Sequence, residues 1–359
     1  MAVVTARTWG DPRVNAYPFP VVRIPTFATR PTRPQSCIGQ AFTGAPVANW
    51  DWVLRAGHSR DLPPGPLYGR ANPLTSLVAA QRLANRLGRK LIIHFSDPIP
   101  SPWDEPKSLV WQKTKRFVCQ CITQASLVTF TTEGALGWME DILDLELRSK
   151  SHFVRNIVPD WPLTNPSAEV RREVVYVGNF GARRSPDALL RGIAAFNRSC
   201  PDQELGFRIV GGQIDSTENP STFPPVPVTR SPFTCCAAAE YRASALAAVV
   251  DADDKRPVFL ATKAGEAMHA ARRVLFVTPP GSPVRQVFDR NLQSVAFVSH
   301  DPGQIGAAIE RLMAVADETA IREVALKQKM LQEFRGETVA RSLLRRIQDF
   351  SLCASQGLT

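Results

Sequence analysis

The chain has 359 residues, of which 44% are hydrophobic and 21% charged, a composition typical of a globular protein long enough for two domains. No segment reaches the roughly 18 consecutive apolar residues of a membrane-spanning helix, and the first residues lack the basic flank and long apolar core of a signal peptide, so we expect a cytoplasmic protein. The formal net charge of +10 favours anionic partners, namely nucleotide phosphates or anionic lipid. No nucleic-acid-binding motif accompanies the basic residues, so no nucleic-acid partner is expected.

The seven cysteines are an odd number, and they form no CxxC pair and have no histidine at metal-ligand spacing. Reduced thiols fit this pattern in a cytoplasmic protein better than disulfides do. A zinc site would need a second pair of Cys or His ligands at the expected distance, and the sequence offers none. We therefore expect no metal.

The N-terminal half alternates short apolar segments with amphipathic ones. Strands are expected at residues 1–5, 20–25, 90–95 and 125–130, and helices at 77–87, 109–122 and 138–142. Ser108 stands where its side chain can cap the second of these helices. Strands that alternate with helices predict a parallel α/β sheet. Residues 26–66 carry no clear period, and their structure is left open.

The pattern restarts after a linker at 162–172 that is rich in Pro, Ser and charged residues. One strand is expected before this linker, at 153–159, as the last element of the N-terminal half. After the linker, strands are expected at 173–178, 206–212, 247–251, 274–277 and 295–298, and helices at 186–196, 238–246, 302–315 and 318–334, with Thr262 as the N-cap of a further short helix. These elements make a second α/β domain. We expect an N-terminal domain at 1–160, a C-terminal domain at 173–335 and a C-terminal helix at 336–359, for which a return to the N-terminal domain is one option.

A glycine-containing loop joins the strand at 173–178 to the helix that follows it. Gly178 and Gly181 enclose this loop, and Arg183 and Arg184 end it. Backbone amides at the start of a helix, together with guanidinium groups, can neutralise a diphosphate without a metal. The alternative is a tight turn required for packing, followed by a solvated basic loop.

The helix behind Thr262 carries Lys263 and Glu266 three residues apart, so both side chains project from one side of its first turns. One interpretation is a carboxylate that binds two ribose hydroxyls beside a lysine that contacts phosphate or sugar. The other is an ordinary surface ion pair. The next strand, 274–277, ends at Thr278-Pro-Pro-Gly-Ser282, and ligands of open α/β sheets lie at such carboxyl ends. The helix and this turn are therefore expected to face the same site.

Asp97 follows the strand at 90–95, in a position where loops often carry functional residues. His94 lies within that strand, and we expect it to be packed in the core. No Ser/His/Asp combination and no carboxylate pair at recognisable spacing occurs, so a hydrolase is not supported.

Taken in chain order, these motifs resemble the family-4-like retaining glycosyltransferases of GT-B fold. The residues that carry the resemblance are Leu67-Tyr-Gly-Arg-Ala-Asn-Pro73, His94-Phe-Ser-Asp-Pro98, Thr129-Phe-Thr-Thr-Glu133, Tyr176-Val-Gly-Asn179, Arg184-Ser-Pro186, Ile209-Val-Gly-Gly212, Lys263-Ala-Gly-Glu-Ala-Met268 and Pro280-Gly-Ser282. The likeness covers nearly the whole chain. It implies an α/β protein of two Rossmann-like domains, whose parallel sheets face each other across a cleft.

The resemblance also implies the roles of individual residues. Catalytic roles fall to Asp97 and Lys263. The nucleotide-sugar donor is expected at Gly178, Asn179, Arg184, Lys263, Glu266, Gly281 and Ser282. Within this set Arg184 and Lys263 bind the diphosphate and Glu266 binds the ribose. The family needs no metal and no other cofactor, because the nucleotide-sugar is a co-substrate.

The implied function is retaining transfer of a sugar from a nucleotide-diphosphate donor to a polysaccharide or lipid-linked acceptor. An anionic membrane surface is a compatible partner of the basic helices at 77–90 and 109–122, at the inner face of the membrane.

Three departures from the family pattern keep a second interpretation open. Val258 stands eight positions before Glu266, where the family often has another glutamate. Ala270-Ala-Arg-Arg273 replaces a turn that usually contains Gly and Pro. The first residues look like the family's second strand, so its first strand and helix are expected to be absent. The alternative is a truncated or degenerate homologue that binds nucleotide without turnover.

Overall fold

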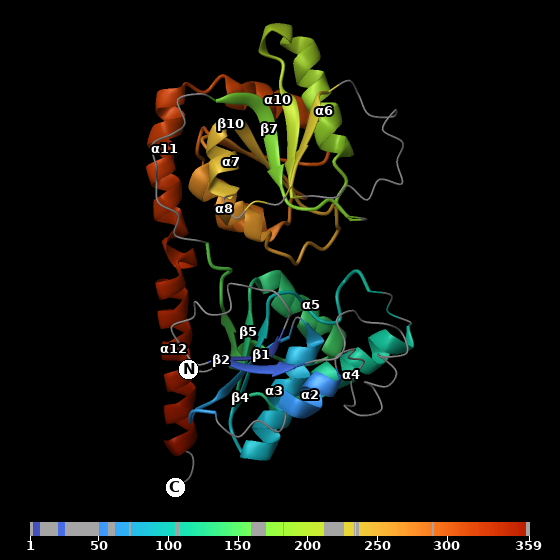
Figure 1. Ribbon diagram of the computed structural model, residues 1–359, viewed down its shortest axis with the longest axis vertical. Coiled ribbons are helices and arrows are strands. Elements are labelled where there is room, and N and C mark those ends of the chain that lie inside the picture. Colours follow the sequence, from blue (N-terminus) through green and yellow to red (C-terminus); the bar gives the residue numbers. More distant parts are fainter. Residues whose placement is uncertain are drawn as a thin grey trace. The chain divides into compact units, whose positions relative to one another are not determined.

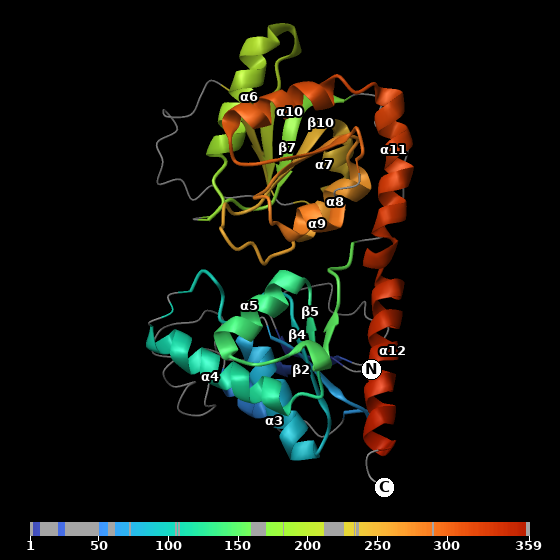
Figure 2. The ribbon, with the colours of Figure 1, turned by 180° about the vertical axis from the view of Figure 1, so that it is seen from behind.

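The computed structural model describes residues 3–7, 21–25, 50–56, 62–71, 73–104, 106, 108–158, 170–181, 183–211, 226–232, 234, 237–288 and 291–356. Contacts between residues divide the chain into two compact units. Unit 1 comprises Met1–Val154 and Leu343–Thr359, and unit 2 comprises Arg155–Ser342. Figures 1 and 2 show the elements of both units from opposite sides. Each unit contains its own parallel sheet.

Unit 2 is built on a parallel sheet of six strands. They are β7 (Arg171–Val177), β8 (Gly206–Val210), β9 (Val228–Ser231), β10 (Ser244–Val250), β11 (Val274–Val277) and β12 (Val295–Val298). Their order across the sheet is β12-β11-β10-β7-β8-β9, and every neighbouring pair is parallel. Parallel sheets occur almost only where both faces are covered. The helices between the strands provide this cover.

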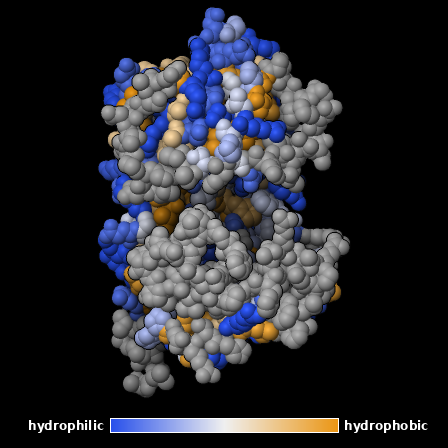
Figure 3. Space-filling model, in the orientation of Figure 1, coloured by the Kyte–Doolittle hydropathy of each residue, from blue (hydrophilic) through white to orange (hydrophobic). Residues whose placement is uncertain are grey.

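The helices of unit 2 are α6 (Asp187–Ser199), α7 (Ala237–Ala243), α8 (Thr262–Ala270), α9 (Pro283–Phe288), α10 (Pro302–Met313) and α11 (Asp317–Met330), with 3-10 turns η3 (Pro201–Gln203) and η5 (Leu331–Phe334). α12 (Gly336–Gln356) begins in unit 2 and ends in unit 1. Around the end of α6 and η3, at the upper edge of Figure 3, the surface is hydrophilic. Among the described residues no helix is both long enough and apolar enough to cross a membrane.

Alternate strand residues enter two separate cores of unit 2. Val174 and Tyr176 of β7 pack in the core that α6 and α10 complete, whereas Val175 and Val177 pack with α7, α8 and α9. In Figures 1 and 2, α6 and α10 lie side by side on one face of the sheet and α7 and α8 lie on the other. Successive side chains of a strand point to opposite faces of the sheet. Because both faces of β7 are covered, its apolar run is continuous.

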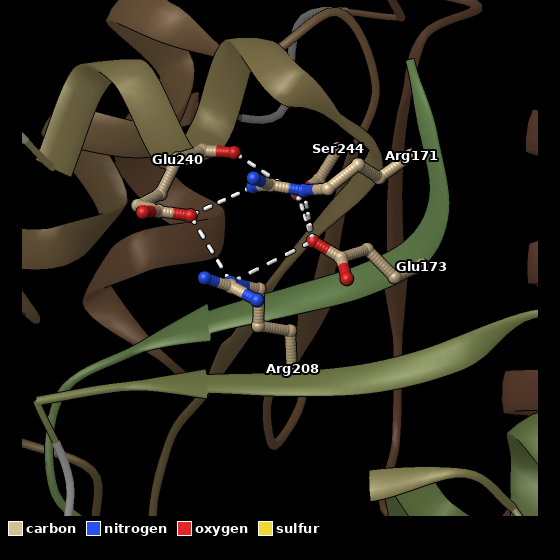
Figure 4. Close-up of polar contacts among 5 residues, drawn as sticks. All are labelled: Arg171, Glu173, Arg208, Glu240 and Ser244. Carbon is tan, nitrogen blue, oxygen red and sulfur yellow. Dashed lines mark hydrogen bonds and ion pairs between the residues drawn. The ribbon is translucent and has the colours of Figure 1, made fainter. Parts of the chain in front are cut away.

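Five polar residues form a closed network near the amino ends of these strands (Figure 4). Arg171 donates from Nε to Glu173 Oε1 at 2.7 Å and from Nη2 to Glu240 Oε2 at 2.7 Å. Arg208 Nε donates to the same Glu240 oxygen at 3.1 Å. Ser244 Oγ donates to Glu173 Oε1 at 3.0 Å. The network ties β7, β8, β10 and α7 together.

Unit 1 contains a second parallel sheet and a separate parallel strand pair. The sheet has the order β3 (Leu67–Arg70), β4 (Leu91–Phe95), β5 (Leu127–Phe130), β6 (Ser151–Phe153), and the pair is β1 (Val3–Arg7) with β2 (Val21–Pro25). The helices are α2 (Trp50–Ala56), α3 (Leu74–Leu87), α4 (Leu109–Gln124) and α5 (Glu133–Leu143), with the 3-10 turn η2 (Arg148–Lys150). Every residue of β4 and β5 is buried, so both strands are covered on both faces.

Most elements expected from the sequence are confirmed, and the exceptions have physical causes. Ser108 caps α4 as expected, because its Oγ accepts a hydrogen bond from Trp111 N at 3.1 Å. The expectation for Thr262 is wrong: it is the first residue of α8, and Ala261 is the N-cap without a side-chain bond. β9 was not expected, because three of its four side chains are exposed. The strand at 153–159 was placed too late, since β6 ends at Phe153.

Candidate functional site

The carboxyl ends of the parallel strands in unit 2 lie along one edge of the sheet. The first residue after each of three strands still forms a backbone hydrogen bond to the neighbouring strand. These bonds join Gly178 N to Val210 O at 3.0 Å, Asp251 N to Val277 O at 3.0 Å and Thr278 N to Val298 O at 2.9 Å. The residues that follow β7, β10 and β11 are therefore held in a row. Open α/β sheets bind their ligands at such an edge.

The loop after β7 is anchored by a glycine and two aromatic rings. Gly178 has a φ of 139°, a conformation that favours glycine. Tyr176 stacks on Phe180 with ring centroids 4.0 Å apart, and its hydroxyl donates to Asn179 O at 3.1 Å. Gly178 and Asn179, both predicted to contact the donor, are therefore fixed at the end of β7.

Arg184 closes the same loop. Its backbone N donates to Gly181 O at 2.8 Å, and its side chain is half-buried. Burial raises the pKa of Tyr176, and the charge of Arg184 opposes this shift. The Nε atom of Arg184 is buried and has no hydrogen-bond partner within the described ranges. Its neighbour Arg183 is exposed.

Lys263 and Glu266 meet on α8, as their spacing predicts. Lys263 Nζ donates to Glu266 Oε2 at 2.8 Å. The side chain of Glu266 is 10% exposed and that of Lys263 is 35% exposed, so the pair is not an ordinary surface pair. An ammonium has three N–H donors and a carboxylate has about four acceptor positions. Both groups therefore keep capacity for a ligand.

Gly265 allows α8 to approach a neighbouring segment closely. A Cβ atom at this position would lie 2.4 Å from Val158 Cγ2, which is too short for any real contact. The glycine of the Lys263-Ala-Gly-Glu motif thus serves packing, while the residues on either side of it carry the charges.

Ser282 and Asp251 form a buried pair at the same edge. Ser282 Oγ donates to Asp251 Oδ2 at 2.7 Å and accepts from Val284 N at 3.2 Å. Burial raises the pKa of Asp251, while the Ser282 hydrogen bond and the charges of Arg184 and His300 lower it. Both hydrogen bonds of the Ser282 hydroxyl are therefore made within the protein, and they fix the turn before α9. Gly281, the preceding residue of this turn, is exposed.

His300, which follows β12, completes this cluster. Its Nε2 lies 2.9 Å from the backbone oxygen of Asp251. Because a carbonyl oxygen can only accept, Nε2 carries the hydrogen in this arrangement. The other ring nitrogen, Nδ1, lies 3.5 Å from Asp253 Oδ1.

Tyr241 of α7 connects the α8 pair with the loop after β7. Burial raises its pKa well above the usual value, and the nearby charges of Glu266 and Tyr176 add to the shift. The charges of Arg184 and Asp251 act on Tyr176 in turn. Electrostatic interactions through these two tyrosines therefore link segments 176–184 and 251–282, which are far apart in sequence.

The turn after α8 lacks Gly and Pro and is held instead by α11. Lys327 is fully buried and donates from Nζ to Ala271 O at 2.7 Å and to Arg272 O at 2.8 Å. Burial lowers the pKa of this lysine to about 7. Arg273 Nη2 donates to Asp317 Oδ1 at 2.7 Å. These contacts fix the end of the helix that carries Lys263.

Asp97, the other predicted catalytic residue, belongs to unit 1 and follows β4 there. It is half-buried, and its role stays a prediction. His94 is packed in the core as expected: its Nδ1 lies 2.9 Å from Thr129 Oγ1, and burial lowers its pKa to about 4. It is therefore neutral at physiological pH.

Sequence reasoning missed Asp251, His300 and Tyr241 as parts of this site. The signal for Asp251 was present, because an acidic residue directly follows a buried strand. The aspartate's partner Ser282 lies 31 residues further on, so only the fold reveals the pair. No group of three or more His, Cys, Asp or Glu side chains that could hold a metal occurs in the described part of the chain. Arg184 and Lys263 suit a phosphate-bearing anion.

No family model and no curated protein matches the sequence. Solved structures do match. TarM of S. aureus, crystallised as a mutant with fondaparinux, α-GlcNAc-glycerol and UDP, is 13% identical with a TM-score of 0.55, over 75% of this chain and 53% of TarM. HepE of Anabaena in complex with UDP and glucose is 16% identical with a TM-score of 0.60, over 92% of this chain and 86% of HepE.

The α,α-trehalose 6-phosphate synthase of Burkholderia multivorans is 11% identical with a TM-score of 0.62, over 93% of this chain and 86% of the synthase. This chain has the GT-B fold. The expected architecture of two Rossmann-like units with parallel sheets is thus confirmed. The chain spans only about half of the length of TarM.

Proposed function

We propose that this protein transfers a sugar from a nucleoside-diphosphate donor to a carbohydrate acceptor, and that the donor binds at the carboxyl edge of the unit 2 sheet. The observation that carries the proposal is the partly buried Lys263–Glu266 pair at the start of α8, together with Arg184 in the loop after β7, whose buried Nε has no hydrogen-bond partner in the described residues. The matching TarM and HepE structures contain UDP, which supports a nucleotide-sugar donor.

In this proposal Arg184 and Lys263 bind the diphosphate, on which negative charge grows as the bond to the sugar breaks. Preorganised cations stabilise such a charge more strongly than water does. Glu266 accepts hydrogen bonds from the two ribose hydroxyls and so fixes the nucleotide. Gly178 and Asn179 let the donor approach the backbone of the loop after β7 closely. Gly281 and Ser282 form the turn on the other side of the donor.

Retention of configuration and independence from a metal or other cofactor belong to the same proposal. The acceptor hydroxyl attacks the anomeric carbon on the face that the diphosphate leaves, and the departing phosphate oxygen takes the hydroxyl proton. The products are the new glycoside and a nucleoside diphosphate. Asp97 is proposed to position the acceptor, which is a polysaccharide or a lipid-linked sugar.

Incubation with radiolabelled UDP-, GDP- and ADP-sugars, followed by chromatography of the products, tests the proposal. We expect one donor to yield labelled glycoside, and the Lys263→Ala variant to be slower by about 100-fold. The Arg183→Ala variant, which removes an exposed arginine of the same loop, is the matched control. Absence of both nucleotide binding and turnover would contradict the proposal.

Nucleotide binding without turnover would instead favour the degenerate homologue. One observation points that way: Val258, which stands where the family that this chain resembles often has a second glutamate, is buried and apolar.

The start of α4 supports a peripheral contact with the cytoplasmic face of a membrane. Leu109 and Val110 are 65% and 61% exposed, and Lys113 and Arg116 follow within the next two turns. Apolar side chains beside basic ones are typical of interfacial helices. We expect co-sedimentation with liposomes that contain anionic phosphatidylglycerol, and its loss in the Leu109→Ser, Val110→Ser double variant. Sedimentation that is independent of lipid charge would contradict this contact.

A further inference from the structure

A pocket lies beside the outer strand of the unit 2 sheet, away from the carboxyl edge. β12 is the last strand in the order of the sheet, and residues 291–294 lead into its amino end. Side chains of this segment, of α9, of β12 and of the end of α10 enclose about 450 Å³ there. Pockets of this size accommodate small organic ligands. The predicted donor residues lie at the opposite ends of the strands, so this pocket is a separate place on unit 2.

Two arginines line the pocket, and no acidic residue of the described ranges does. They are Arg285 of α9 and Arg311 of α10. Neither guanidinium forms a hydrogen bond or an ion pair with another described residue, and the Nε atom of Arg285 is buried. A buried donor that lacks a partner is costly unless water or a ligand satisfies it. The pocket therefore offers unused donors and positive charge to an anion.

An aromatic ring positions the guanidinium of Arg285. Its Cζ atom lies 5.4 Å from the ring centroid of Phe297, and Phe297 stacks on Phe276 with centroids 4.8 Å apart. A contact between a cation and an aromatic ring orients the guanidinium without neutralising its charge. The charge of Arg285 is therefore preorganised at the pocket and available to a ligand.

The segment before β12 is fixed from behind by a carboxylate of α11. Glu323 accepts hydrogen bonds from Gln293 N at 2.9 Å and from Ser294 N at 2.7 Å. Both oxygens of this carboxylate are thus used within the fold. Leu292 and Val295, on either side of these two residues, line the pocket. The pocket therefore combines cationic groups with an ordered apolar wall.

We propose that this pocket binds a small phosphomonoester with an apolar or ring-shaped body, separately from the nucleotide-sugar. The phosphate contacts Arg285 and Arg311, whose planar guanidinium groups suit phosphate oxygens. The body of the ligand packs on Leu292 and Val295. Two cations without an acidic neighbour on the pocket wall favour a phosphate, which carries close to two charges at neutral pH, over a singly charged carboxylate. No residue of this pocket belongs to the proposed donor site, so the two sites stand or fall independently.

Phenyl phosphate is the probe, because its dianion and its ring match the two parts of the pocket. Calorimetric titration of the full-length protein at pH 7.5 should show saturable binding with a Kd below about 1 mM. Arg285→Gln and Arg311→Gln should each weaken this binding by about tenfold. Arg311 is exposed, so its replacement leaves the core intact. Arg322→Gln, which changes an exposed arginine of α11 outside the pocket, is the matched control and should bind within about twofold of the wild type.

Two further variants separate the parts of the ligand and the two sites. Leu292→Ala should weaken phenyl phosphate by about threefold and leave the binding of inorganic phosphate unchanged, because only the ring contacts this side chain. Lys263→Ala removes a cation of the donor site and should leave the affinity for phenyl phosphate unchanged.

Equal affinity in the wild type, Arg285→Gln and Arg311→Gln, or no binding of phenyl phosphate to the wild type, would overturn this site. Binding that is lost in Lys263→Ala but retained in Arg311→Gln would place the phosphate at the donor site and would overturn it as well. Binding of phenyl phosphate without any binding of UDP, GDP or ADP would contradict the donor site alone.

Discussion

The two ends of the unit 2 sheet use charged residues in different ways. At the amino end, two arginines and two glutamates contact one another directly, and each carboxylate oxygen involved has more than one donor (Figure 4). At the carboxyl end, Asp251 is bonded to a neutral hydroxyl and Arg184 Nε has no hydrogen-bond partner in the described residues. Charges that are satisfied by several internal partners stabilise a fold, whereas charges with unused hydrogen-bonding capacity, such as Arg184 and the Lys263–Glu266 pair, are available to a ligand. Stability and binding should therefore respond to different substitutions.

The largest expected effect is on stability, from Glu240→Ala at the amino end. The change removes the carboxylate shared by Arg171 and Arg208 and leaves two guanidinium groups half-buried near each other. We expect a loss of about 2–3 kcal/mol in the free energy of unfolding, measured by urea denaturation, and no change in UDP affinity at 15 °C.

Glu337→Ala is the control for this prediction, because Glu337 pairs with Arg341 on an exposed helix face. We expect this change to alter the free energy of unfolding by less than about 0.5 kcal/mol. Equal effects of Glu240→Ala and Glu337→Ala would show that the network does not stabilise the sheet.

Lys263→Ala at the carboxyl end should give the reverse pattern. Loss of a charge-assisted bond to the diphosphate should weaken UDP binding by about 10- to 100-fold, which corresponds to about 1.5–3 kcal/mol. The free energy of unfolding should fall less than in Glu240→Ala, by about 1 kcal/mol, because Lys263 is 35% exposed although its partner Glu266 is largely buried. Calorimetric titration checks the affinity, and Arg183→Ala should bind UDP within about twofold of the wild type.

A smaller effect is expected from Tyr176→Phe, which removes the hydrogen bond to Asn179 O and leaves the ring stack on Phe180. The lost hydrogen bond should cost the ordered conformation of the loop after β7 about 1 kcal/mol. UDP affinity should therefore fall by about threefold to fivefold. A change in stability without any change in affinity would show that this loop does not contact the nucleotide.

The smallest expected effect is that of salt. Between 50 and 500 mM NaCl the Debye length falls well below 10 Å, so UDP affinity at the exposed carboxyl end should decrease by roughly twofold. The urea midpoint of the wild type should change little, since the network at the amino end is only partly exposed. An affinity that is insensitive to salt would argue against a charge-based site.

The parts of this fold that sequence reasoning predicted correctly are those with strong local signals. The strand Val274–Val277 is a short apolar run between a helix and a Pro-Gly turn, and the α8 pair follows from three-residue spacing. The border between α7 and β10 was missed because the alanine-rich segment from Ala237 to Ala248 suits helix and strand equally. β9 was missed because it is an exposed edge strand without an apolar pattern.

The parts of the candidate site that were predicted are likewise those with a local sequence signal. Lys263 and Glu266 are local neighbours, and Arg184 follows a glycine loop that sequence motifs identify. The contact between His300 and Asp251 depends on the order of β10 and β12 in the sheet, which local patterns do not specify. The contact between Lys327 and the end of α8 likewise joins residues 56 positions apart.

A crystal structure of the protein grown with UDP is the decisive test of the donor site. We expect diphosphate density within hydrogen-bonding distance of Arg184 and Lys263, with the ribose hydroxyls at Glu266. UDP bound elsewhere, or crystals from saturating UDP in which the Lys263–Glu266 pair and its surroundings show no nucleotide, would contradict it.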